Sequence, residues 1–257
     1  MEPIERALAK ARRSRHQPFV ATVVSAPPRQ PVSPVYSTTR IVPADPLALK
    51  REHVIANRAN DADAGLYRTL RAQVLLWLAK TGKRSFAVVS ASDNEGRSMT
   101  AANLAVALSM DVNQTVLLVD ADLRNPGVHK KFGIDPTFGL DDVLQGNAAI
   151  EKCLINPGME RLVLFPSRSP LPNGAELLAS PQMAQIATEL RNRYRDRVVV
   201  YDAPALLGHG DAIGFLPYVE AVLLVVRDGV VRPDEMARMK ELLKDCSVIG
   251  AVLNGVV

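Results

Sequence analysis

The sequence predicts an α/β domain with a mostly parallel, doubly wound sheet and helices on both faces. Short runs of almost purely apolar residues recur along the chain, which is typical of strands buried on both faces of a parallel sheet. Stretches with helical periodicity separate most of these runs, as expected when helices cover such a sheet. The expected strands are Phe86–Ser90, Val116–Asp120, Leu162–Phe165, Val198–Tyr201, Ala221–Val226 and Val248–Leu253, and the expected helices include Thr100–Met110, Ala175–Tyr194 and Asp234–Leu243.

The N-terminal residues 1–15 predict a short basic helix. Ile4, Leu8 and Ala11 are spaced to line one helical face, with lysines and arginines around the rest. Five basic and two acidic residues fall in this segment, so it carries +3 of the formal net charge of +4. A nucleic-acid-binding domain would distribute its basic charge differently, as a patch or stripe on the folded surface. We therefore expect no nucleic-acid partner.

The segment from Pro18 to Pro46 is rich in proline and has no glycine, which predicts an extended linker. We expect residues 1–61 to comprise the leader helix and this flexible linker, and residues 62–257 to form the folded domain. The domain is expected to begin with a helix that Gly82 ends. The apolar stripe of that helix consists of Leu66, Leu70, Val74, Trp77 and Leu78.

Three features of the sequence point to the cytoplasm. Apolar runs such as Ala221–Val226 are much shorter than the roughly 20 residues that cross a bilayer. The charged N-terminus lacks the apolar core of a signal peptide. Cys153 and Cys246 have neither metal-ligand nor redox spacing, as is usual in a reducing compartment.

A phosphate-binding loop is predicted between the first strand and the helix that follows it. The octapeptide Ala91–Ser98 has the position of the G-x-x-x-x-G-K-[ST] pattern, in which backbone amides at a helix N-terminus hold phosphates. Gly96 and Ser98 match that pattern. Ala91 replaces its first glycine, and Arg97 stands where the lysine is expected.

Carboxylates close two further predicted strands. Asp120 and Asp122 lie two residues apart at the end of one strand, and Asp202 ends another. Ligand sites of parallel sheets gather at the carboxyl ends of the strands, and residues i and i+2 of a strand share one side. These side chains are therefore candidates to hold Mg²⁺ or a water bound to it.

With these motifs the chain resembles the bacterial tyrosine kinases (BY-kinases) of capsular and exopolysaccharide biosynthesis, the CpsD/CapB-like group of the P-loop NTPase superfamily. The resemblance covers roughly residues 62 to 254 and implies a ParA/MinD-like fold. Its most specific segment is Asp120-Ala-Asp122-Leu-Arg124-Asn-Pro126. The other matching segments are Tyr67–Arg71, Ser90–Thr100, Glu176–Ser180 and Gly250–Asn254, together with His129, Asp202-Ala-Pro204 and Asp211.

The resemblance implies ATP and Mg²⁺ as cofactors and assigns roles to individual positions. The implied nucleotide contacts are Asn94, Glu95, Gly96, Arg97, Ser98, Met99 and, at the adenine ring, Asn254. The implied metal ligands are Ser98, Asp120 and Asp202. The implied catalytic residues are Arg97, Asp120, Asp122 and Asp202. Arg68 and Arg71 match a helix that packs neighbouring subunits into a homo-oligomer.

The implied function is that of an ATP-dependent tyrosine autokinase that regulates exopolysaccharide biosynthesis or export. Its implied partner is a membrane-anchored polysaccharide co-polymerase, or chain-length determinant, that recruits it to the inner face of the cell membrane. Two alternatives stay open. Arg97 in place of lysine is compatible with a catalytically impaired pseudokinase that acts as a scaffold. A ParA/MinD-type ATPase is the other alternative, and the segment Asp120–Pro126 argues against it.

Overall fold

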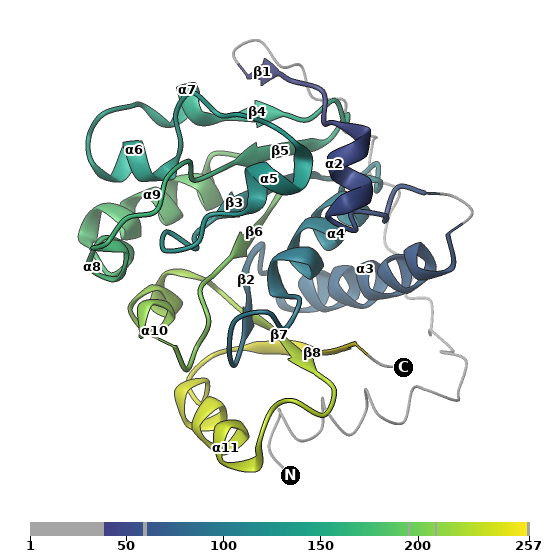
Figure 1. The fold of residues 1–257 in the computed structure, drawn as a ribbon, viewed down its shortest axis with the longest axis vertical. Helices are drawn as coiled ribbons and strands as arrows, with labels where there is room; N and C mark the ends of the chain where they lie inside the picture. Colours follow the sequence, from purple (N-terminus) through teal and green to yellow (C-terminus); the bar gives the residue numbers. More distant parts are fainter. Residues whose placement is uncertain (1–38, 59–60, 195, 209, 256–257) are drawn as a thin grey trace.

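The computed structural model describes residues 39–58, 61–194, 196–208 and 210–255. The expected leader helix and the prolines before residue 39 lie outside these ranges. In the described part, eight strands form one sheet in the order β1-β4-β5-β3-β6-β2-β7-β8 (Figure 1). All neighbouring pairs are parallel except β4 and β5. The strands are β1 (Arg40–Ile41), β2 (Ser85–Ser90), β3 (Thr115–Asp120), β4 (Ile155–Asn156), β5 (Leu162–Phe165), β6 (Arg197–Asp202), β7 (Val222–Arg227) and β8 (Val248–Asn254).

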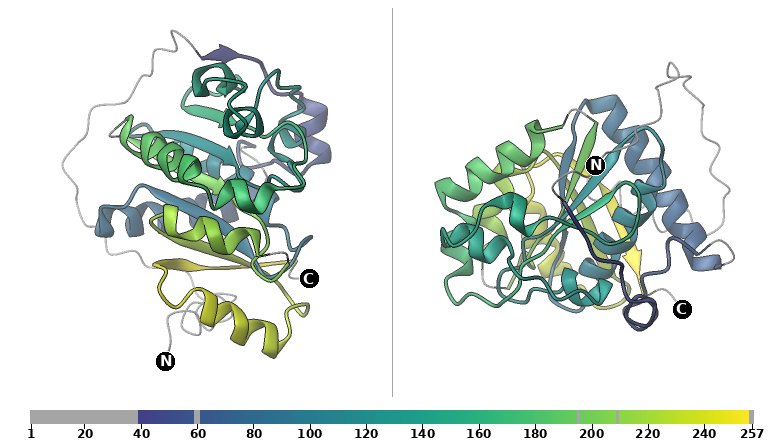
Figure 2. Two further views of the ribbon diagram at one scale, coloured as in Figure 1. Left: turned by 90° about the vertical axis from the view of Figure 1, so that its left-hand side faces the viewer. Right: turned by 90° about the horizontal axis from the view of Figure 1, so that it is seen from above.

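Helices cover both faces of the sheet (Figure 2). Along β2, Phe86 and Val88 pack with α3, α4 and α5 on one face, and Ala87 and Val89 belong to the core on the other face. The predicted fold class is therefore confirmed. The helices are α2 (Pro46–Arg51), α3 (Ala62–Thr81), α4 (Arg97–Ser109), α5 (Val128–Phe132), α6 (Leu140–Leu144), α7 (Ile150–Cys153), α8 (Gly174–Leu178), α9 (Pro181–Asn192), α10 (Asp211–Phe215), the 3-10 turn η2 (Leu216–Tyr218) and α11 (Pro233–Leu242).

The structure corrects two of the expected helices. The single helix expected over residues 175–194 is two helices, because Ser180 caps the amide of Met183 and Pro181 opens α9 at its first turn. In α3, Leu66 is 68% exposed, so it is not part of the buried stripe. The fully buried side chains of that helix include Ala64 and Val74.

Residues 40–56, expected from the sequence to belong to the linker, pack on the domain. β1 pairs with β4 at the sheet edge, and Val54 and Ala56 are fully buried. The Asn103 side chain of α4 accepts hydrogen bonds from the amides of Ile55 and Ala56, at 2.7 and 3.0 Å. The packed unit thus begins before residue 62. A two-residue strand and a six-residue helix are too short to leave a periodic signal in a sequence.

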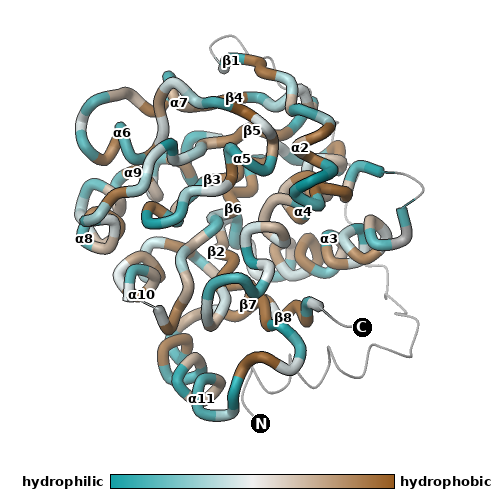
Figure 3. Tube along the Cα trace, viewed as in Figure 1, coloured by the Kyte–Doolittle hydropathy of each residue, from teal (hydrophilic) through white to brown (hydrophobic). Residues whose placement is uncertain are grey.

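The sheet brings three strand ends together. β3, β6 and β2 are adjacent and parallel, so the loops that follow them leave from the same edge. The central strands are hydrophobic, whereas an outer helix such as α11 is mostly hydrophilic (Figure 3). Among the described helices, none combines the length and hydropathy needed to cross a membrane.

Candidate functional site

The loop between β2 and α4 (residues 91–96, the β2–α4 loop) has the backbone shape of an anion site. Asn94 and Gly96 have positive φ angles of 61° and 89°, the left-handed region that glycine and asparagine tolerate best. A Cβ atom on Gly96 would lie 2.0 Å from Nδ2 of Asn254. No side chain caps the N-terminus of α4. Its first amides are therefore available to a phosphate.

Glu95 ties this loop to the sheet. Its side chain is buried, and its two carboxylate oxygens accept hydrogen bonds from the amides of Ser92, at 2.6 Å, and Arg227, at 3.2 Å. Burial raises the pKa of the Glu95 carboxyl. The Asn254 side chain donates to the Glu95 carbonyl oxygen at 2.9 Å. Both residues therefore contribute to the shape of the loop.

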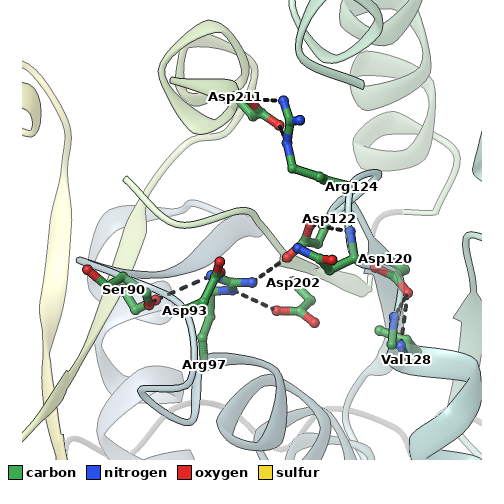
Figure 4. A network of polar contacts seen from close by, with 12 residues as sticks. Ser90, Asp93, Arg97, Asp120, Asp122, Arg124, Val128, Asp202 and Asp211 are labelled. Carbon is green, nitrogen blue, oxygen red and sulfur yellow. Dashed lines mark hydrogen bonds and ion pairs between the residues drawn. The ribbon is translucent and has the colours of Figure 1, made fainter. Parts of the chain in front are cut away.

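Arg97, the first residue of α4, turns its guanidinium group toward the strand ends (Figure 4). The side chain is only 7% exposed. Its Nη2 makes a short ion pair with Asp122, and its Nε lies 3.4 Å from Oδ1 of Asp202. Its Nη1 donates to Oγ of Ser90 at 3.3 Å and lies 3.6 Å from Oδ1 of Asp93. The positive charge is thus shared among three carboxylates.

The predicted carboxylates form one cluster, Asp120, Asp122 and Asp202 (the aspartate cluster). Asp120 and Asp202 are paired across β3 and β6. Oδ2 of Asp120 accepts hydrogen bonds from the amides of Gly127 and Val128 at the start of α5, both at 2.9 Å. Within the described residues, Oδ1 of Asp120 and Oδ2 of Asp202 are buried without a hydrogen-bond partner.

Burial sets the electrostatics of the cluster. It raises the pKa of all three carboxyl groups, and the negative charge of Asp202 raises the pKa of Asp120 further. The guanidinium group of Arg97 opposes this rise in the pKa of Asp122 and of Asp202. The Ser98 hydroxyl also lowers the pKa of Asp202. The cluster is therefore rich in negative charge, and one arginine partly neutralises it.

The donor set around the cluster suits Mg²⁺. The unpartnered oxygens of Asp120 and Asp202 and the hydroxyl of Ser98 are hard ligands of the kind that this ion prefers. In the described chain, no group of three or more histidine, cysteine or acidic residues is arranged to hold a metal by itself. Mg²⁺ usually combines one or two carboxylates with phosphate oxygens and water, which would complete its coordination beside Asp120 and Asp202.

The remaining predicted residues lie at two places. Met99 is in the first turn of α4, next to the β2–α4 loop. Arg71 donates to the Ala107 carbonyl oxygen at 3.2 Å, near the C-terminus of α4, and Arg68 donates to the Arg58 carbonyl oxygen at 3.5 Å. Both arginines thus have partners in their own chain, and their place in an oligomer interface stays a prediction.

Two sets of contacts in the site were not predicted from the sequence. Arg124 makes a two-pronged ion pair with Asp211, at 3.0 and 3.1 Å, which links the segment after β3 to the first turn of α10. Ser90 and Asp93 contact Arg97. Arg124 and Asp211 are 87 positions apart, so no spacing rule joins them.

Comparisons with known proteins decide the family. No protein-family model matches the chain. Tyrosine-protein kinase YwqD of Bacillus subtilis (strain 168) is 32% identical over 209 residues, which are 80% of this chain and 87% of YwqD. The chain belongs to the bacterial tyrosine-protein kinase family. The predicted family is thereby confirmed.

A longer relative and a solved structure agree with this assignment. The succinoglycan biosynthesis transport protein ExoP of Rhizobium meliloti (strain 1021) is 32% identical over 212 residues, which are 78% of this chain but only 26% of ExoP. The kinase domain of the Escherichia coli tyrosine kinase ETK superposes with a TM-score of 0.72 at 25% identity. The match covers 86% of this chain and 90% of that domain. The fold of this BY-kinase relative is thus that of a kinase domain.

Proposed function

We propose that this BY-kinase relative binds ATP at the β2–α4 loop and regulates the biosynthesis or export of an exopolysaccharide. The uncapped N-terminus of α4 beside the aspartate cluster is the observation that carries the proposal. It joins an anion site to hard metal ligands, as phosphoryl transfer requires. The names of the relatives support the process: YwqD is a tyrosine-protein kinase, and ExoP is a succinoglycan biosynthesis transport protein.

Each residue of the site has a distinct proposed role. The amides of residues 94–98 bind the phosphates, with Met99 beside them. Glu95 and Asn254 maintain the shape of the loop near the proposed position of the adenine ring. Ser98, Asp120 and Asp202 are the proposed ligands of Mg²⁺, which when bound neutralises charge on the phosphate oxygens. Asp122 is the proposed acceptor of the proton of an attacking tyrosine hydroxyl, a role that requires Arg97 to turn away from it.

The proposed partner is a membrane-anchored chain-length determinant. The chain matches about a quarter of ExoP, a succinoglycan biosynthesis transport protein, and this likeness to part of a transport system supports such a partner. We place the protein at the inner face of the cell membrane through this partner, and we propose self-association through Arg68 and Arg71 on α3.

A second function, a nucleotide-binding scaffold without phosphotransfer, is favoured by one observation. The guanidinium group of Arg97 is bound to Asp122 and Asp202. In a kinase, the lysine at this position follows charge on the transferred phosphate. Only interactions that strengthen in the transition state accelerate the reaction, and a rigid planar fork tracks that charge less well than an ammonium group.

Tyrosine phosphorylation and ATP turnover of the wild type and of Arg97→Lys distinguish the two functions. Both proteins are assayed with the cytoplasmic segment of the membrane partner. We expect the lysine variant to be faster by about tenfold or more, since each ~1.4 kcal/mol of better alignment is worth that factor. A wild type as fast as its variant shows a loop adapted to arginine. If neither protein phosphorylates tyrosine or turns over ATP while both still bind ATP, the scaffold function is established.

A further inference from the structure

The guanidinium group of Arg97 lies against the aspartate cluster and is a cation supplied by the protein itself. The side chains of Asp122, Asp202 and Arg97 are all buried, with exposed fractions of 4%, 1% and 7%. Burying a carboxylate is costly unless a cation or hydrogen bonds compensate its charge. Arg97 provides that compensation in the resting protein.

The guanidinium group uses separate nitrogens for separate partners. Nη2 binds Asp122, Nε approaches Asp202, and Nη1 reaches Ser90 and Asp93. An ammonium group is a single point of charge on a flexible stem and does not present such a fork. The arrangement is therefore specific to arginine.

A divalent cation that used the same carboxylates would meet the guanidinium group at contact distance. Two cations at one place repel strongly where water is excluded. We propose that the guanidinium group of Arg97 is the resident cation of the site and competes with Mg²⁺ for Asp202, one of the proposed metal ligands, so that the resting protein does not take up free divalent metal. The proposal concerns the protein without nucleotide, so it stands apart from the proposed kinase or scaffold function.

A matched arginine lies close by in the same protein. Arg124 is bound to one carboxylate, that of Asp211, and its side chain is 35% exposed. Removal of Arg124 leaves one unpaired carboxylate, whereas removal of Arg97 leaves a group of three that includes the unpartnered oxygens of Asp120 and Asp202. Only the second change leaves the neighbouring carboxylates of Asp120 and Asp202 without a cation, so that a divalent ion can use them with water as its remaining ligands.

The experiment measures binding of Mn²⁺ as a stand-in for Mg²⁺, through the loss of the electron paramagnetic resonance signal of free Mn²⁺. Full-length wild type, Arg97→Met and Arg124→Met are titrated without nucleotide. We expect Arg97→Met to bind one Mn²⁺ that excess Mg²⁺ displaces, about tenfold or more tightly than the other two proteins. Adding Asp202→Asn to Arg97→Met should abolish this binding.

Thermal unfolding provides a second readout. Mg²⁺ should raise the Tm of Arg97→Met and leave that of the wild type and of Arg124→Met unchanged, because a ligand stabilises only the folded state that binds it. Arg97→Gln, which keeps a polar side chain without charge, replaces Arg97→Met if the latter does not fold. Equal Mn²⁺ affinity of the wild type and the Arg97 variant overturns the proposal, and so does a folded Arg97 variant that binds no Mn²⁺.

Discussion

Two arginine–aspartate contacts lie near each other beyond the carboxyl ends of the central strands (Figure 4), and they differ in their charge balance. Arg124 and Asp211 form a closed pair, in which both carboxylate oxygens accept from one guanidinium group. Arg97 is surrounded by Asp93, Asp122 and Asp202, and carboxylate oxygens nearby have no partner in the described structure. A closed pair has its charges satisfied, whereas the Arg97 group has an excess of negative charge.

The difference separates a structural contact from a binding site. Paired charges with matched geometry hold two segments together and require nothing further. Buried carboxylates that lack partners store an unfavourable energy, which a cation can relieve. The perturbed pKa values of the aspartate cluster, all raised by burial, are typical of such functional sites.

The largest effect on stability is expected for Arg97→Met measured in the presence of EDTA. Removing one member of a buried ion pair leaves an uncompensated charge and costs about 3 to 5 kcal/mol. Adding Asp122→Asn should recover part of this loss, because the carboxylate that was left unpaired is then neutral. Urea unfolding of the single and double variants gives the coupling energy. Additive losses would show that Arg97 and Asp122 do not depend on each other.

A smaller and opposite effect is expected for Asp120→Asn. Burial holds the pKa of Asp120 well above its ordinary value, so the folded protein keeps this proton longer than the unfolded chain as pH rises. The contribution of Asp120 to wild-type stability therefore falls as pH rises from the unfolded pKa, about 4, through the folded pKa. The asparagine variant lacks this loss and still accepts the amides at the start of α5. It should gain roughly 1 kcal/mol or more at neutral pH.

The pH profile of urea unfolding checks this prediction. The two proteins should have the same stability below about pH 4, where the carboxyl is protonated in both states, and they should diverge above it. A constant difference at all pH values would assign the effect to packing rather than to charge.

The smallest effect is expected for Arg124→Met. The guanidinium group of Arg124 is partly exposed, so water already screens its charge. The urea midpoint should shift less than in Arg97→Met, and the shift should not respond to Mg²⁺. A loss equal to that of Arg97→Met would remove the distinction between the two contacts.

Much of the fold follows from local patterns in the sequence. The apolar runs predict the six long strands, and the rule that ligands gather at strand ends predicts that Asp120, Asp122 and Asp202 meet. The direction of the Arg97 side chain is not predictable in this way, because it depends on carboxylates 25 and 105 positions away.

Other parts of the structure depend on packing that leaves little trace in the sequence. From the sequence, Glu95 is an acidic residue beside a phosphate site. In the structure its carboxylate is buried and accepts hydrogen bonds from two backbone amides, so it connects the loop to the sheet. Residues 40–56 contain too short a strand and helix to show periodicity. Leu66 fits a helical stripe by spacing, yet its side chain on α3 is 68% exposed.

Calorimetric titration of ATP into the full-length protein, with Mg²⁺ and with EDTA, tests most directly whether the β2–α4 loop binds nucleotide. The loop variant is Gly96→Ala, in which a Cβ would press on the Asn254 side chain at a positive φ of 89°. Gly82→Ala is the matched control, because Gly82 also has a positive φ, of 70°, but has open space around its Cβ position. We expect one ATP site per chain in the wild type and in folded Gly82→Ala, and a much weaker site in Gly96→Ala. Absence of saturable binding to the wild type under both conditions, or equal binding by all three proteins, would contradict this account.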